Sequence, residues 1–181
     1  VTAAEPTRPD ATNYEQMVGR AIGFLATKGQ AEDGSFSGQA GPAVTALVAT
    51  ALMRHGRTPS DPLVARSLAY LEQFIQPDGG VFGAGSLYAN YETSIAILCL
   101  AEANKDGRYT EKLKKAEAYI KGLQWDEGEN KDSSDPAYGG AGYGKHKRPD
   151  LSNTQFFVDA LQAMGTDRND EAVKRALIFV S

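Results

Sequence analysis

The chain has 181 residues, 41% hydrophobic and 23% charged, which is the ordinary range for one globular domain. Its formal net charge of −4 gives no basic face for nucleic acid, so no nucleic-acid partner is expected. The single cysteine, Cys99, excludes an intramolecular disulfide and a multi-cysteine metal site. No apolar run approaches the ~20 residues that a membrane span requires, so no transmembrane segment is predicted.

The first segment, residues 1–11, mixes Ala, Pro, Thr and charge without periodicity, which predicts a flexible lead-in. Because the chain opens with Val1 rather than Met, we expect a trimmed or processed start, and export to the periplasm or medium if a signal was removed. Residues 12–181 are expected to form one helical repeat domain. Its last helical pattern runs on to Ser181, so this domain is expected to be truncated at its C-terminal end.

Four segments have the spacing of one-sided amphipathic helices. The apolar face of the first carries Tyr14, Met17, Val18, Ala21 and Leu25, and Gly29 follows as a stop. Polar residues that can cap free amides precede the other three, namely Ser60 or Asp61, Thr110, and Asn169 or Asp170.

Between them lie three segments that are apolar nearly all round, at residues 42–54, 91–102 and 152–164. Such helices must be surrounded by protein. Alternation of wet-sided and enclosed helices predicts two layers, outer and inner, in a ring. An open solenoid satisfies the same pattern.

Each copy also repeats a glutamine and an aromatic residue after its one-sided helix. The three pairs are Gln30 with Phe36, Gln76 with Phe82, and Gln124 with Trp125. A glutamine beyond a helix end can satisfy orphan backbone groups while the ring excludes water, so we interpret these residues as hairpin staples.

This repeated pattern of a basic residue, an aromatic–aliphatic pair, a Gln and an Asp-Gly resembles the QW motif of squalene-hopene and oxidosqualene cyclases. It is also similar to the repeats of protein prenyltransferase beta subunits, and the resemblance covers most of residues 14–181. It implies an all-α fold in which tandem helical hairpins form an α-α toroid around a largely apolar cavity. Roughly three of about six hairpins, half a ring, are present. The implied ligand is an apolar, isoprenoid-like molecule.

The chemistry of that family is not visible in these residues. The D-x-D-D acid motif of the cyclases is absent, and the nearest strings, residues 132–135 and 167–170, lack adjacent carboxylates. Cys99, His55 and His146 do not match the Asp, Cys and His zinc ligands of the prenyltransferases. We therefore expect no metal and no cofactor, and leave enzymatic activity open.

Six residues near the starts of the apolar helices would gather at one mouth of a ring, close to partially positive helix ends. These predicted ligand-binding residues are Thr45, Tyr91, Glu92, Thr93, Asn153 and Thr154. Two carboxylates are the candidate catalytic acids, Glu92 and Asp159. Stabilisation of a helix end by Glu92, and a solvent-facing stripe containing Asp159, are the alternatives.

Three functions remain open from sequence. The first is binding of an apolar ligand without catalysis, and the second is the N-terminal portion of an active cyclase or prenyltransferase. The third is a structural interaction module whose exposed apolar edges are covered by a partner or by a second copy, two half-rings closing one toroid. If the chain is instead a portion of a longer protein, its missing C-terminal half would close the toroid. The long charged segment 126–150 is expected to be a mobile surface loop or a cover over the cavity mouth.

Overall fold

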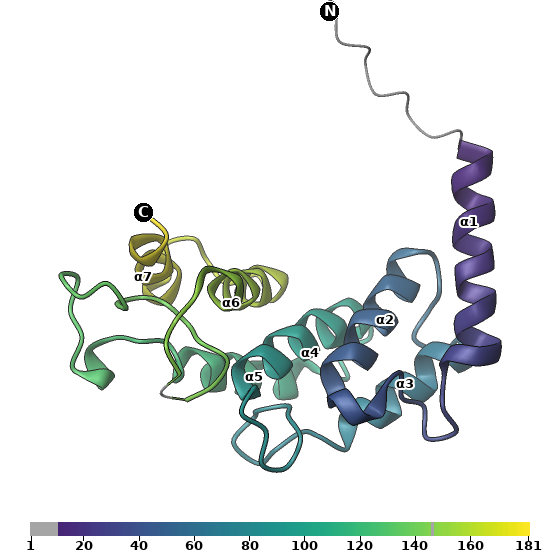
Figure 1. Ribbon diagram of the computed structural model, residues 1–181, viewed down its shortest axis with the longest axis horizontal. Coiled ribbons are helices and arrows are strands. Elements are labelled where there is room, and N and C mark those ends of the chain that lie inside the picture. Colours follow the sequence, from purple (N-terminus) through teal and green to yellow (C-terminus); the bar gives the residue numbers. More distant parts are fainter. Residues whose placement is uncertain (1–10, 146) are drawn as a thin grey trace, which may run out of the picture.

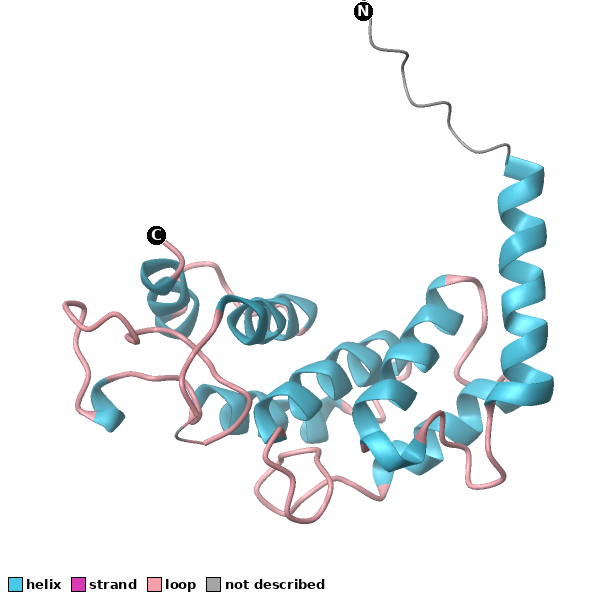
Figure 2. Ribbon diagram, in the orientation of Figure 1, coloured by secondary structure: helices cyan, strands magenta, loops and turns pink. Residues whose placement is uncertain are grey.

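The computed structural model describes residues 11–145 and 147–181, and these form seven α-helices without a strand (Figure 2). The predicted lead-in lies outside the described residues except for Ala11, which opens the first helix. His146 also lies outside them. The helices are α1 (Ala11–Phe24), α2 (Pro42–Arg54), α3 (Pro62–Glu72), α4 (Ala89–Ala103), α5 (Thr110–Lys121), α6 (Leu151–Ala163) and α7 (Glu171–Phe179).

Two layers of helices follow an arc (Figure 1). The apolar helices α2, α4 and α6 pack side by side as the inner layer, because α4 contacts both of the others. In the outer layer α3 covers α2, α5 covers α4, and α7 covers α6. The prediction of an all-α partial toroid with inner and outer helices is therefore confirmed.

Aspartate side chains cap the starts of α3, α6 and α7. Asp61 accepts from the backbone N–H of Leu63 at 3.0 Å, and Asp170 from that of Ala172 at 2.9 Å, so the aspartate is the cap in both predicted pairs. Thr110, predicted as a cap, is instead the first residue of α5 and has no capping bond.

Each outer helix closes on the turn that precedes its inner partner, so the structural unit is turn, inner helix, outer helix. Three turn glycines have positive φ, 91°, 98° and 82°, a conformation that side chains rarely adopt. A Cβ on any of them would strike the backbone of the next outer helix. The contacts are Gly34 on Arg66, Gly79 on Lys115 and Gly139 on Arg175.

The first helix stands apart from this scheme. α1 has no buried residue, and Tyr14, Met17 and Phe24 are 48%, 55% and 62% exposed. Of the residues predicted to form its apolar face, Tyr14 and Met17 are exposed, whereas Leu25, directly after α1, packs against the core. An outer helix packs on the inner helix before it in the chain, and within the described residues none precedes α1.

The segment between α5 and α6 is held at several points along its length. The backbone N–H of Trp125 donates to Gly140 at 2.9 Å, and that of Asn90 in α4 donates to Tyr143 at 2.9 Å. Tyr138 is buried and donates to Glu127 at 2.7 Å. The described part of this segment is therefore bonded to the helical layers, not a free surface loop.

Candidate functional site

Three of the predicted ligand-binding residues are the fully buried threonines of the inner helices. Each hydroxyl accepts a hydrogen bond from a backbone N–H of the preceding turn, at 2.9 to 3.0 Å. The pairs are Thr45 with Phe36, Thr93 with Val81, and Thr154 with Ala141. Each threonine therefore ties a turn to its own inner helix, and these pairs define equivalent positions in the three units.

In two of the three units the repeated glutamine bonds the start of the next outer helix. Gln30 donates to the carbonyl of Leu63 at the start of α3 at 2.9 Å. Gln124 donates to the carbonyl of Ala172 at the start of α7 at 2.8 Å. Gln76 instead donates to Phe74 and Phe82, each at 3.1 Å, and stays within its own turn.

A one-residue difference in register explains this exception. The turn glycines donate to Ala31, Gln76 and Trp125. Gln76 therefore occupies the position of Trp125, not that of Gln124, and Phe82 stands one residue beyond the position of Phe36. The sequence alignment matched Gln with Gln and aromatic with aromatic. The backbone hydrogen bonds instead match Gln76 with Trp125, which moves the second unit by one residue relative to the other two.

The three predicted staple rings have different surroundings. Phe36 is 3% exposed within the core. Phe82 stacks on Tyr119 with centroids 5.6 Å apart, and the Lys131 ammonium lies 5.5 Å above the Trp125 ring.

Glu92 is 5% exposed and accepts from the backbone N–H of Gly83 at 3.2 Å. Gly41, the residue before α2, has a φ of 78°, which side chains rarely adopt, and a Cβ there would meet the carboxylate of Glu92. Burial raises the pKa of Glu92, and the bonds from Ser86 and Gly83 oppose that rise only in part. Glu92 therefore bonds the turn before α4 and lies against the start of α2.

Two other candidates also have protein partners. Tyr91 packs edge-on against Phe156, with ring centroids 5.4 Å apart. The Asn153 amide nitrogen donates to Asp150 at 2.6 Å, while its buried amide oxygen has no partner. A ligand-binding role for the six residues stays a prediction.

The three inner helices share a hollow of about 410 Å³, which we call the inner-face pocket. Its lining is Leu47, Thr50, Ala51, Arg54 and His55 from the α2 side, Ile95 and Leu98 from α4, and Phe156 and Asp159 from α6. None of the six predicted ligand-binding residues lines it, whereas the candidate acid Asp159 does.

Position in the repeat explains this lining. Two residues after the buried threonine, every inner helix presents an apolar side chain, namely Leu47, Ile95 and Phe156. Five residues after it stand Thr50, Leu98 and Asp159. Sequence reasoning missed the apolar level, because the spacing from the threonines marks equivalent positions but does not show that they meet in a pocket.

The other end of the pocket is polar. Arg54 lies 3.8 Å from Glu102, and the ring of Tyr14 in α1 lies 6.1 Å from that of His55. Thr50 donates to the carbonyl of Ala46 at 2.8 Å and is satisfied. The pocket thus combines an apolar wall with a few polar groups, as small-molecule sites do.

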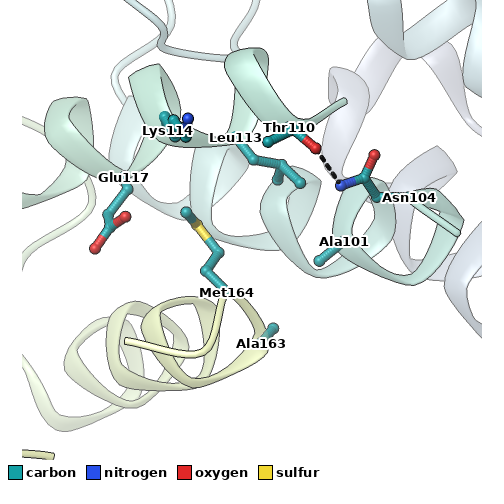
Figure 3. Close-up of a pocket in the computed structure, with 8 residues that line it drawn as sticks. All are labelled: Ala101, Asn104, Thr110, Leu113, Lys114, Glu117, Ala163 and Met164. Atoms are coloured by element: carbon teal, nitrogen blue, oxygen red, sulfur yellow. Dashed lines mark hydrogen bonds between the residues drawn. The ribbon is translucent and has the colours of Figure 1, made fainter. Parts of the chain in front are cut away.

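A second hollow of about 380 Å³ lies between α5 and the ends of α4 and α6 (Figure 3). Its polar side chains already have protein partners. Asn104 donates to Thr110 at 3.1 Å, Lys114 pairs with Glu111 at 2.8 Å, and Glu117 pairs with Lys121. Little hydrogen-bonding capacity is left there for a ligand.

No helix of the described chain is both long and apolar enough to cross a bilayer. Residues 11–145 and 147–181 contain no group of three or more His, Cys, Asp or Glu that could hold a metal ion. Cys99 is fully buried, and burial raises the pKa of its thiol to about 12, so it acts as a small core residue.

The two-layer helical arc is that of an α-α toroid-type protein. Residues 39–181 match the family model of the squalene-hopene cyclase C-terminal domain, so the chain belongs to that family. The match starts after α1 and after the turn that contains Gly34, and it covers the three pairs of inner and outer helices. No curated protein matches the chain.

Proposed function

We propose that the protein binds an apolar, isoprenoid-like ligand in the inner-face pocket. The observation that supports this most directly is the apolar wall of the pocket, in which Leu47 and Phe156 have accessible surface and Ile95 is fully buried. The volume of the inner-face pocket, about 410 Å³, lies in the usual range for small-molecule sites. Membership of the squalene-hopene cyclase family favours an isoprenoid over other apolar molecules.

Asp159 is the candidate acid that this location favours, since it faces the same hollow as the apolar level. Glu92 is turned toward Gly83 and the start of α2, and a helix-joining role suits it better. The lining residues as they stand support ligand binding without a catalytic step.

Binding of farnesol and squalene to the purified chain tests the proposal, by equilibrium dialysis and by thermal shift. Leu47→Arg should weaken binding at least about tenfold, because it places a charge on the apolar wall. Leu47 is 43% exposed, so the fold should tolerate this change.

Ile178→Arg is the matched control, since Ile178 is 47% exposed and lies outside the pocket. Its affinity should equal that of the unchanged chain. Binding that Leu47→Arg leaves unaltered, or no binding of either isoprenoid, would contradict the proposal.

A further inference from the structure

The inner-face pocket changes character along the helix axes. Its first level is formed by Leu47, Ile95 and Phe156 and is wholly apolar. Three residues further on, α4 presents Leu98 and α6 presents Asp159 at the equivalent position. Arg54 and His55 follow at the end of α2. A ligand in this pocket therefore meets hydrocarbon at one end and polar groups at the other.

The polar groups have spare hydrogen-bonding capacity. Among the described residues, no hydrogen bond or ion pair involves the carboxylate of Asp159 or the ring of His55. Arg54 has a single loose ion pair, 3.8 Å from Glu102, which also pairs with Lys105 at 3.5 Å. A carboxylate only accepts and a guanidinium only donates, so both kinds of partner are available.

Charge at this end is balanced. Arg54 is offset by Asp159 within the lining, and the neighbouring Lys105 is offset by Glu102, so a diphosphate would gain no net attraction and would face the carboxylate of Asp159. A pure hydrocarbon would cover Asp159 and Arg54 without replacing their water, which costs free energy. A neutral group that both donates and accepts avoids both penalties.

Building on the proposed function, we propose that the ligand of the inner-face pocket is an isoprenoid alcohol. Its hydrocarbon chain lies against Leu47 and Phe156, beside the fully buried Ile95. Its hydroxyl donates to the carboxylate of Asp159 and accepts from Arg54 or His55. The ring of Tyr14, 6.1 Å from that of His55, flanks this polar end from α1.

Three probes with the same carbon chain test the head group: farnesol, farnesyl diphosphate and the hydrocarbon farnesene. We expect the full chain to bind farnesol about tenfold more tightly than either of the others, the difference of roughly one good hydrogen bond. Equilibrium dialysis of each labelled probe measures this.

Asp159→Leu introduces the residue that the repeat carries at this level in α4. It should reverse the preference, weakening farnesol about tenfold and favouring farnesene. Asp159→Asn keeps the size and should weaken farnesol less, because it removes the charge but retains an acceptor. Asp167→Leu is the matched control, since it removes an exposed carboxylate outside the pocket and should change neither affinity.

The outcomes separate the two proposals. The proposal of an alcohol ligand is overturned if farnesene binds as tightly as farnesol, or if farnesyl diphosphate binds most tightly. The proposed function would still stand in both cases. Affinities that Asp159→Leu and Asp159→Asn both leave unchanged also overturn it. Failure of all three probes to bind rejects the proposed function itself.

Discussion

Helices α1 and α3 carry the same pattern but lie in different surroundings. Residues 46 positions apart correspond, so Met17, Val18, Phe24 and Leu25 match Leu63, Val64, Tyr70 and Leu71. All four residues of α3 are at most 6% exposed, whereas Met17 is 55% and Phe24 is 62% exposed.

Three contacts of α3 account for the difference. Its apolar face packs on α2, Gly34 closes on the backbone of Arg66, and Gln30 donates to the carbonyl of Leu63. Within the described residues α1 has none of the equivalent partners. An amphipathic pattern therefore specifies which face of a helix can be buried, while the neighbouring unit decides whether it is.

The largest expected difference between α1 and α3 is in the free energy of unfolding lost when an equivalent aromatic side chain is truncated in each. Tyr70→Ala should lower the free energy of unfolding by about 3 kcal/mol, because it empties a buried site packed against Phe74. Phe24→Ala should change it by no more than about 0.5 kcal/mol, because that ring is exposed. Urea unfolding followed by circular dichroism measures both, and equal losses would show that α1 is buried in solution.

A substitution in the turn before α2 should disrupt the close approach of Gly34 to the backbone of α3, a contact that α1 lacks. Gly34→Ala should cost more than about 2 kcal/mol, since the residue has φ of 91° and its Cβ would strike the carbonyl of Arg66. Gly56→Ala is the control, with φ of 86° but nothing within 4 Å, and should cost only the backbone strain of about 1 kcal/mol. Similar losses for the two variants would mean that the close approach contributes nothing.

The glutamine that reaches α3 should matter less than the turn glycine. Gln30→Ala should cost about 1 to 2 kcal/mol, because it leaves the Leu63 carbonyl without this donor. Gln76→Ala should cost less, about 0.5 to 1 kcal/mol, since Gln76 bonds only within its own turn. Thermal unfolding compares the stabilities of the two variants. A larger loss of stability for Gln76→Ala would contradict the assignment of the inter-helix role to Gln30 and the local role to Gln76.

The smallest expected effect concerns the junction that Glu92 makes with the start of α2. Burial raises its pKa in the folded state, so the protonated form is favoured there. Its contribution is fully present below the unfolded pKa and is lost as pH rises through the raised folded pKa. Glu92→Gln removes this titration, so its stability relative to the unchanged chain should increase with pH and then level off.

Denaturant unfolding at a series of pH values from 4 to 8 checks this pH dependence. Glu32→Gln, at an exposed position, is the control and should follow the unchanged chain throughout. A Glu92→Gln difference that is constant over the series would mean that Glu92 titrates alike in the folded and unfolded states.

The inner helices were the most predictable part of the fold. Residues 42–54 form α2 as expected, and α4 and α6 extend at most two residues beyond or short of their predicted ends. A helix that is apolar all round has only one stable environment, so its pattern predicts both its type and its burial.

The candidate site was predicted less well, for two physical reasons. The polar residues at the helix starts were expected to be free for a ligand, but the hydroxyls of Thr45, Thr93 and Thr154 bond backbone N–H groups of the turns. Turn geometry also moved Gln76 and Phe82 one residue out of register, which side-chain identity alone does not reveal.

Sequence by itself determined the helical periodicity, the alternation of layers, the glycine turns and the family resemblance. The periodicity, the alternation and the turns can be read from residues that are near one another in the chain, and the resemblance comes from the repetition of these local patterns. Only the tertiary structure decided that α1 lies exposed and that Leu47, Leu98, Phe156 and Asp159 share one pocket. Burial and pocket formation depend on which elements meet in space, and a local pattern cannot encode the presence of a distant partner.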